Sequence, residues 1–414
     1  MNTTMTHSTN FPYLQQVIIN DFFGHKNLTT TIFNVGEKVK HFIITGKNGS
    51  GKTTFLHRLF DTVYGINGGS FKDHIARYKQ IQADIESGKI RNGGSVQSEI
   101  DKWNQIEAIF SKENNNLFQG NEFVEIKNQI IVVFFEASRK IEVKEVITVT
   151  REDELETQLL QNKSGQTYAE LFKQYLVNKK VFQVFNAMDG KAEDAKQQEN
   201  FFIKLEATLA KIFEDPALKL EFIREKFEFY IRLSNGQQFT FNQLSAGFSS
   251  LLSILTELLM RTDLLRKQAD NYAYDPCGFV FIDEPETHLH LEMQYQILPL
   301  LTGMFPHLQF IVATHSPAVA SSIKGATIFD LSTGDVLGDE AAGSSFSELM
   351  QDHFGVENEF SNVADEIIAD IKRIVRLPNH AQASQQLLDL LAEKGRYMSA
   401  TLQLEVEAQL IGLE

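Results

Sequence analysis

Apolar runs near the start of the chain predict a small antiparallel unit that leads into a buried strand. Residues 13–25 and 29–35 alternate apolar and polar positions, as strands with one covered face do. Residues 41–45 have an apolar centre and are expected to form a buried strand, which ends in a glycine-rich run. The helical pattern of residues 53–65 follows, so we expect the order strand, loop, helix.

A second group of strands is expected further along the chain. Residues 128–138 are apolar almost throughout, which favours a strand covered on both faces of a sheet. Residues 226–244 alternate, and their Asn-Gly dipeptide predicts a hairpin. Two more strands are expected in residues 278–285 and 308–317, and a short strand pair in residues 327–335.

Three further segments have helical patterns and are expected to lie outside the group of strands. Residues 70–120 are polar with helical spacing and are interpreted as an insertion, while residues 151–228 carry amphipathic helix patterns and are interpreted as a compact helical arm. Residues 341–414 are expected to form a C-terminal helical region. The α/β core would then consist of residues 1–69, 121–150 and 229–340.

Composition narrows the class of protein. A hydrophobic fraction of 43% and a charged fraction of 22% are ordinary for a soluble globular protein. The net charge of -15 argues against a broad nucleic-acid-coating surface, although a local basic groove stays open. The single cysteine, Cys277, fits a reducing compartment, and no apolar stretch is long enough to cross a membrane. We therefore expect a cytoplasmic location.

The glycine-rich run after the first buried strand matches the phosphate-loop pattern G-x-x-x-x-G-K-[ST] in full. Glycines let backbone N–H groups turn inward around phosphates, and the following helix directs its positive end at them. Lys52 would neutralise the β and γ phosphates of ATP, and the Thr53 hydroxyl would bind Mg²⁺. A chance glycine-rich turn is the alternative, which the strand and helix on either side disfavour. The predicted nucleotide-binding residues are Gly46, Lys47, Asn48, Gly49, Ser50, Gly51, Lys52, Thr53 and Thr54.

An acidic pair, Asp283 and Glu284, ends the apolar run of residues 278–282. The carboxyl end of a buried parallel strand is where ligands of open α/β sheets bind. Asp283 is predicted to hold Mg²⁺ through water, and Glu284 to polarise the attacking water as a general base. An acidic turn that caps the next helix is the alternative, and the phosphate loop in the same chain disfavours it.

Residues 244–247 precede a strongly apolar helix and place a hydroxyl residue and a glycine at its N-terminus. Such an arrangement can bind an anion, but within one subunit it cannot reach the phosphate loop of that subunit. The tetrapeptide resembles the ABC signature LSGGQ, which closes over the γ-phosphate held by a partner subunit; Ala246 and Phe248 depart from it. Ser245, Ala246 and Gly247 are the predicted residues of this site. Taken alone, the tetrapeptide is also compatible with a plain helix cap.

The ordered motifs at residues 46–54, 244–250, 281–290 and 313–317 resemble ABC-type AAA ATPases of the group that holds the overcoming-lysogenization-defect proteins, RecF and the SMC and double-strand-break repair ATPases. The resemblance implies a P-loop NTPase fold of ABC-ATPase type, α/β in class, with an antiparallel β subdomain and an inserted helical arm. It also implies that His315 is the switch histidine, which contacts the γ-phosphate. The catalytic residues would then be Lys52, Glu284 and His315.

The sequence contains two further features near these motifs, an arginine and a cluster of acidic residues. Arg139 follows a strand where ABC proteins place a glutamine loop, but no Gln stands there. Arg139 is expected either to approach the phosphates or the other subunit, or to lie exposed on the surface. An acidic cluster at Asp330, Asp335, Asp339 and Glu340 is interpreted as a solvated loop, because too few residues follow His315 for a Toprim nuclease domain.

The acidic pair followed by histidines and the segment 344–371 look most like stand-alone ATPases of bacterial anti-phage systems of the Septu, retron-associated and PARIS types. The resemblance implies a homodimer with composite ATP sites, a higher oligomer being left open. It also implies a separate effector, often a nuclease, with nucleic acid reached through the complex.

Three other functions compete with that of a defence ATPase. A RecF-like or SMC-like repair ATPase that clamps DNA would need a basic groove, and the charge balance leans against it. A nucleotide-binding protein with negligible turnover is disfavoured by the intact motifs. A membrane transporter subunit is disfavoured because the glutamine loop is missing.

Overall fold

The computed structural model describes residues 13–34, 37–68, 80, 84, 87, 89, 106–110, 130–139, 142–161, 165–269, 274–338 and 362–413. The chain divides into two compact units, one ending at Ser344 and the other beginning at Ser345. The first holds all the described strands and the described helical segments from α1 to α10, and the described elements of the second are all helical. Each unit is described by itself below.

The centre of the first unit is a six-stranded sheet with the order β12-β11-β3-β10-β9-β5. All neighbouring strands run parallel except the short β12, which pairs antiparallel with β11. Three central strands are buried along their whole length, which explains why their sequences are mainly apolar. The strands are β3 (His41–Thr45), β5 (Ile131–Phe135), β9 (Gly278–Asp283), β10 (Leu308–Ala313), β11 (Ala326–Asp330) and β12 (Val336–Leu337).

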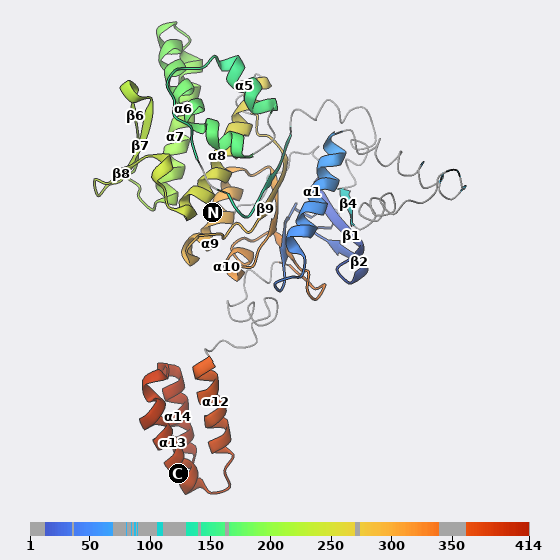
Figure 1. The fold of residues 1–414 in the computed structure, drawn as a ribbon, viewed down its shortest axis with the longest axis vertical. Helices are drawn as coiled ribbons and strands as arrows, with labels where there is room; N and C mark the ends of the chain where they lie inside the picture. The colour runs from blue at the N-terminus through green and yellow to red at the C-terminus, as the bar shows by residue number, and fades with distance from the viewer. Residues whose placement is uncertain are drawn as a thin grey trace. The chain divides into compact units, whose positions relative to one another are not determined.

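Helix α1 (Lys52–Gly68) packs between this sheet and a second, antiparallel sheet, as Figure 1 shows. The second sheet has the order β2-β1-β4, and one continuous apolar core joins it to the central sheet through α1. Its strands are β1 (Leu14–Phe22), β2 (His25–Thr31) and β4 (Ile106–Phe110).

Strand β4 corrects the prediction that residues 70–120 are a helical insertion. Residues 106–110 pair antiparallel with β1, so they belong to the antiparallel sheet. The segment is short and lies in polar surroundings, and its partner is about ninety residues away in the chain. The pattern of apolar and polar residues within a short segment does not predict pairing with so distant a strand. Of the rest of the predicted insertion, only residues 80, 84, 87 and 89 are described.

The predicted arm consists of helices and the start of a small sheet. Its three long helices are α5 (Glu152–Gln161), α6 (Gly165–Met188) and α7 (Ala192–Ile212). Strand β6 (Lys219–Ile223) also falls inside the range 151–228, so the arm is not wholly helical. It pairs with β7 (Glu228–Arg232), which pairs with β8 (Gln238–Phe239) across the predicted Asn-Gly turn, where Gly236 has φ +85°. A short 3-10 helix, η2 (Arg224–Lys226), joins β6 and β7.

The elements that follow the hairpin return the chain to the central sheet. Helix α8 (Ala246–Gln268) contacts both α6 and β5, and α9 follows β9 (Figure 1). These elements are η3 (Phe241–Gln243), α8, α9 (Leu291–Met304) and α10 (Pro317–Ala320).

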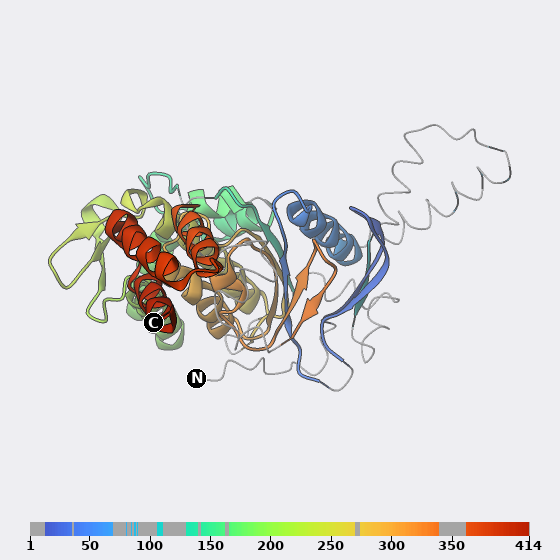
Figure 2. The ribbon, with the colours of Figure 1, turned by 90° about the horizontal axis from the view of Figure 1, so that it is seen from below.

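The second unit is a bundle of three helices with its own core. Buried residues such as Ile367, Leu387 and Val406 pack together along the helices, which appear in red in Figures 1 and 2. The helices are α12 (Asn362–Val375), α13 (His380–Lys394), η5 (Gly395–Tyr397) and α14 (Ala400–Leu413). None of the described helices in either unit is both long and apolar enough to span a lipid bilayer.

Candidate active site

The phosphate loop lies between β3 and α1, as its sequence predicts. Gly46, Gly49 and Gly51 all have positive φ angles, of +136°, +82° and +91°, which side chains with a Cβ rarely adopt. Lys52 is buried, and its ammonium group donates to the carbonyl oxygens of Gly46 at 2.8 Å and Lys47 at 3.1 Å. The loop therefore curls around the position where the phosphates of a nucleotide would bind.

A serine beyond β11 supports this loop from outside the motif. The Ser332 hydroxyl accepts a hydrogen bond from the backbone N–H of Lys47 at 2.6 Å. The Asp330 carboxylate accepts from the backbone N–H of Ser332 at 2.7 Å. A Cβ on Gly46 would lie 2.7 Å from the Ser332 hydroxyl oxygen, so only glycine fits here.

The buried position of Asp330 corrects part of the solvated-loop interpretation. Asp330 is 1% exposed at the end of β11, whereas Asp335 is exposed. Sequence proximity to other acids suggested a surface loop. Asp330 is instead the last residue of β11, and its carboxylate accepts the hydrogen bond from the backbone N–H of Ser332. Asp339 and Glu340 lie outside the described residues.

The acidic pair lies at the carboxyl end of β9, next to the phosphate loop. The Thr53 hydroxyl donates to the Asp283 carboxylate, with distances of 3.0 and 3.2 Å to its two oxygens. Burial raises the pKa of Asp283, and the nearby Glu284 raises it further, while the bond from Thr53 opposes this. Two oxygen ligands suited to Mg²⁺ are therefore side by side.

Glu284 has an unusual backbone that several hydrogen bonds hold in place. Its φ is +44°, which is rare for a residue with a side chain. Its N–H donates to the carbonyl of Ala313 at 2.9 Å, and its carbonyl accepts from the Thr287 hydroxyl at 2.9 Å and from Arg139 at 3.0 Å. The conformation persists because the surroundings fix it, which is common at functional sites.

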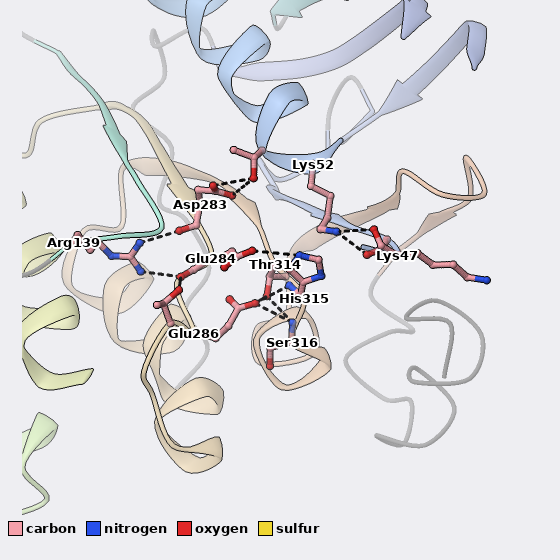
Figure 3. A network of polar contacts seen from close by, with 12 residues as sticks. Lys47, Lys52, Arg139, Asp283, Glu284, Glu286, Thr314, His315 and Ser316 are labelled. Atoms are coloured by element: carbon pink, nitrogen blue, oxygen red, sulfur yellow. Dashed lines mark hydrogen bonds and ion pairs between the residues drawn. The ribbon is translucent and has the colours of Figure 1, made fainter. Parts of the chain in front are cut away.

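Arg139 stabilises the backbone of the acidic pair. Its guanidinium donates to the carbonyl oxygens of Asp283 at 2.8 Å and Glu284 at 3.0 Å (Figure 3). Burial lowers the pKa of Arg139 to about 10. Of the two alternatives at this position, free surface exposure is wrong, and an approach to the phosphates or to another subunit stays a prediction.

His315 lies beyond the end of β10 with its ring toward Glu284. The His315 Nε2 and Glu284 Oε1 atoms are 3.3 Å apart (Figure 3). Burial lowers the pKa of His315, and the positive charge of Lys52 lowers it further. The structure thus brings together Lys52, Thr53, Asp283, Glu284 and His315, all named from the sequence.

Residues 245–247 lie at the N-terminus of α8 as expected. Ser245 occupies the N-cap position, but its side chain makes no capping hydrogen bond and the residue is exposed. Gly247 is buried, and a Cβ there would lie 2.5 Å from the carbonyl oxygen of His288 in the same chain. Contact of Ser245, Ala246 and Gly247 with the nucleotide of a partner stays a prediction.

Sequence reasoning missed three residues of this region: Phe23, Glu286 and Ser332. Phe23 is 60% exposed, has φ +47°, and its ring lies beside the phosphate loop at Gly51. Glu286 accepts hydrogen bonds from residues 314–316. The sequence signal for Glu286 is that it is a third acidic residue, two positions after Glu284. Phe23 and Ser332 have no local sequence signal that points to the phosphate loop.

The donor set fits ATP and Mg²⁺. Backbone N–H groups and Lys52 suit phosphate oxygens, while a hydroxyl and a single buried carboxylate suit an ion that keeps several waters and phosphate ligands. In the described part of the chain, no group of three or more His, Cys, Asp or Glu side chains could hold a metal ion alone. This donor set differs from that of an all-protein metal cage.

Comparisons with known proteins agree with this chemistry. The family model described as "AAA domain, putative AbiEii toxin, Type IV TA system" matches residues 170–321. The Retron Ec83 probable ATPase of Escherichia coli is 26% identical over 67% of this chain and 51% of its own length. The chain thus spans about half the length of that relative. The Septu protein PtuA of Bacillus thuringiensis is 23% identical over 93% of this chain and 96% of its own.

Among solved structures, an Smc head bound to the C-winged helix domain of ScpA overlaps 80% of this chain and 99% of its own, with 14% identity and a TM-score of 0.37. This similarity is too distant to add detail to the fold. The motifs, their placement around one sheet edge and these matches relate the chain to the ABC-type ATPases, among them those of retron and Septu systems.

Proposed function

We propose that this chain hydrolyses ATP to ADP and phosphate at composite sites of a head-to-tail homodimer. We further propose that it is the nucleotide-driven sensor or scaffold subunit of an anti-phage complex, in which it controls a separate effector nuclease. The observation that carries the first proposal is the convergence of Lys52, the Thr53–Asp283 pair and the Glu284–His315 pair on one sheet edge. Turnover is expected to be slow or regulated.

The chemistry follows from the positions of these side chains. Lys52 would leave the carbonyls of Gly46 and Lys47 and bind the β and γ phosphates. Thr53 and Asp283 would hold Mg²⁺, which when bound supplies charge neutralisation at the phosphate oxygens. Glu284 would take a proton from the attacking water, and His315, at 3.3 Å from Glu284, would contact the γ-phosphate.

Dimerisation is proposed because the second anion site is open to solvent at its serine. Ser245 is the exposed N-cap residue of a long helix, and its side chain makes no capping hydrogen bond. In a head-to-tail dimer, Ser245 of one subunit would face the γ-phosphate held by the other. Loss of that phosphate would remove the charge that joins the two subunits.

One experiment separates this proposal from a chain that binds ATP without turnover. The variants Lys52→Ala and Glu284→Gln are compared with the wild type for ATP hydrolysis and, by light scattering, for mass with ATP and ADP. Wild type should hydrolyse ATP, Lys52→Ala should not bind it, and Glu284→Gln should bind ATP and stay dimeric. Equal dimer affinity with ATP and ADP would contradict the γ-phosphate switch.

The support for a defence role is sequence similarity to ATPases named for retron and Septu systems. It is tested by co-purification of the chain with the products of its neighbouring genes. A stable complex with a nuclease-like neighbour, whose activity changes between wild type and Glu284→Gln, is the expected result. A lone dimer that hydrolyses ATP only when DNA is added would favour the repair clamp instead.

A further inference from the structure

Glu286 lies in the turn between β9 and α9, two residues beyond the proposed general base. Its carboxylate points toward Thr314, His315 and Ser316 beyond the end of β10 (Figure 3). It lies within the motif of residues 281–290, but the proposed function gives it no role.

One oxygen of Glu286 gathers three donors from residues 314–316, here called the switch segment. The Oε1 atom accepts from the Thr314 hydroxyl at 2.7 Å, the His315 N–H at 2.6 Å and the Ser316 N–H at 3.1 Å. Hydrogen bonds to a carboxylate in a water-poor site are stronger than those between neutral groups. The switch segment is therefore tied to the turn that carries Glu284.

Other bonds close this connection into a ring. Glu284 N–H donates to Ala313 just before the switch segment, and the Ser316 hydroxyl donates to Gln294 of α9 at 2.7 Å. Within the ring, the Glu284 carboxylate and the His315 ring are 3.3 Å apart. The distance between the two reactive side chains thus depends on the bonds that Glu286 makes to the switch segment.

We propose that Glu286 is a positioning residue for ATP hydrolysis, which holds the switch segment so that His315 and Glu284 act on the same γ-phosphate. This inference rests on the proposed ATPase function. The hydrogen bonds of the Glu286 carboxylate described above all go to the switch segment, so its role would lie in turnover and not in nucleotide binding. A misplacement of about 1 Å can lower a rate about a hundredfold.

The test compares Glu286→Ala and Glu286→Gln with the wild type. For each protein, kcat, the KM for ATP, the dissociation constant of a fluorescent ATP analogue and the melting temperature are measured. Glu286→Ala should lower kcat by about 10- to 100-fold and leave the dissociation constant nearly unchanged. Glu286→Gln should recover most of kcat, because the amide oxygen of Gln can occupy the position of Oε1 and accept the same three hydrogen bonds. The NH₂ group of Gln would then take the position of Oε2, which accepts no hydrogen bond from the described atoms.

Glu292→Ala is the matched control, because this exposed glutamate lies in the first turn of α9, close in sequence but directed to solvent. It should leave kcat unchanged. If Glu286→Ala does not fold, Thr314→Val replaces it, since valine keeps the shape but removes one of the three donors. A several-fold loss of kcat without a change in analogue binding is then expected.

Three results would overturn the inference. The first is a kcat of Glu286→Ala, or of Thr314→Val where it is the variant used, close to that of the wild type. The second is a joint loss of ATP binding and melting temperature that Gln does not restore, which would show a merely structural role. The third is a wild type without any turnover, which overturns the proposed function as well and is recognisable before any variant is compared.

Discussion

At the scale of single residues, Phe23 stands out beside the phosphate loop. Its φ of +47° and its exposure of 60% are both unfavourable for a bulky apolar side chain. A strained backbone costs about 1–3 kcal/mol and tends to be retained where function uses it. The exposed ring lies next to Gly51, so it is placed to stack on the base of a nucleotide whose phosphates occupy the loop.

Phe23→Ala should therefore weaken ATP binding about tenfold, since stacking of a base on an aromatic ring contributes about 1–3 kcal/mol. Phe23→Trp should bind ATP as the wild type does. The dissociation constants of ATP and of inorganic tripolyphosphate, measured by calorimetry, separate stacking from damage to the loop. The tripolyphosphate constant should not change, and Ile147→Ala, at another exposed apolar residue, should change neither. Equal weakening of both ligands would refute base stacking.

His41 gives a prediction for stability against pH. The residue is 3% exposed in β3, its Nδ1 atom accepts from the backbone N–H of Phe310 at 3.1 Å, and burial lowers its pKa to about 4. The unfolded chain takes up a proton near pH 6.5, and the folded chain only near pH 4. The contribution of neutral His41 is thus complete above pH 6.5 and is lost, at about 1.4 kcal/mol per pH unit, as the pH falls toward 4.

His41→Asn should flatten this dependence, because its amide oxygen can accept the same hydrogen bond and does not titrate. The measurement is the melting temperature between about pH 7 and about pH 5, where the wild type should fall more steeply than the variant. His380→Asn, at an exposed histidine of α13, should follow the wild type. Parallel curves for wild type and His41→Asn would contradict the assignment.

At the scale of elements, β5 is held to the sheet by a glycine. A Cβ on Gly278, the first residue of β9, would lie 1.9 Å from the carbonyl oxygen of Ile131 in β5. Gly278→Ala should force the two strands apart and destabilise the unit by about 1–3 kcal/mol. Because Arg139 follows β5, kcat should fall together with the melting temperature.

Calorimetric melting and steady-state ATP hydrolysis check this prediction. Gly395→Ala, where a Cβ would meet no atom within 4 Å and φ is -55°, should leave both quantities unchanged. A Gly278→Ala protein that melts at the wild-type temperature would show that β5 can shift without cost.

The sequence predicted those elements whose signal is local. The phosphate loop located β3 and α1, and continuous apolar runs located β9 and β10. Strands β4 and β6 were missed because each is short and its place depends on a partner strand. The same limit applies to side chains: Ser332 reaches Lys47 across 285 residues of sequence, a pairing that only the fold creates.

Aromatic packing joins the arm to the helix that begins at the second anion site. Phe248 stands where the ABC signature has glutamine, and its ring stacks on Phe213 at the end of α7 with centroids 4.5 Å apart. Phe213 also packs against Phe239 of β8. A movement of the arm would therefore be transmitted through these rings to the first turn of α8.

At the scale of the whole molecule, the proposed dimer makes each active site depend on two chains. Lys52→Ala disables the phosphate loop of its own chain, whereas Ser245→Arg would disable the site of the partner. Each variant alone should be inactive. In an equimolar mixture, half of the dimers should be mixed, and each mixed dimer should contain one site with both defects and one intact site.

Mixing the two inactive variants should therefore restore up to about a quarter of the wild-type rate, since one in four sites is intact when subunits exchange at random. Steady-state hydrolysis after co-incubation measures this, and light scattering confirms that mixed dimers form. A mixture of Lys52→Ala with Glu284→Gln is the control: both changes lie in the half-site of the same chain, so every site keeps one defect and no activity should return. If the Lys52→Ala and Ser245→Arg mixture stays inactive although mixed dimers form, residues 245–247 do not complete the site of a partner.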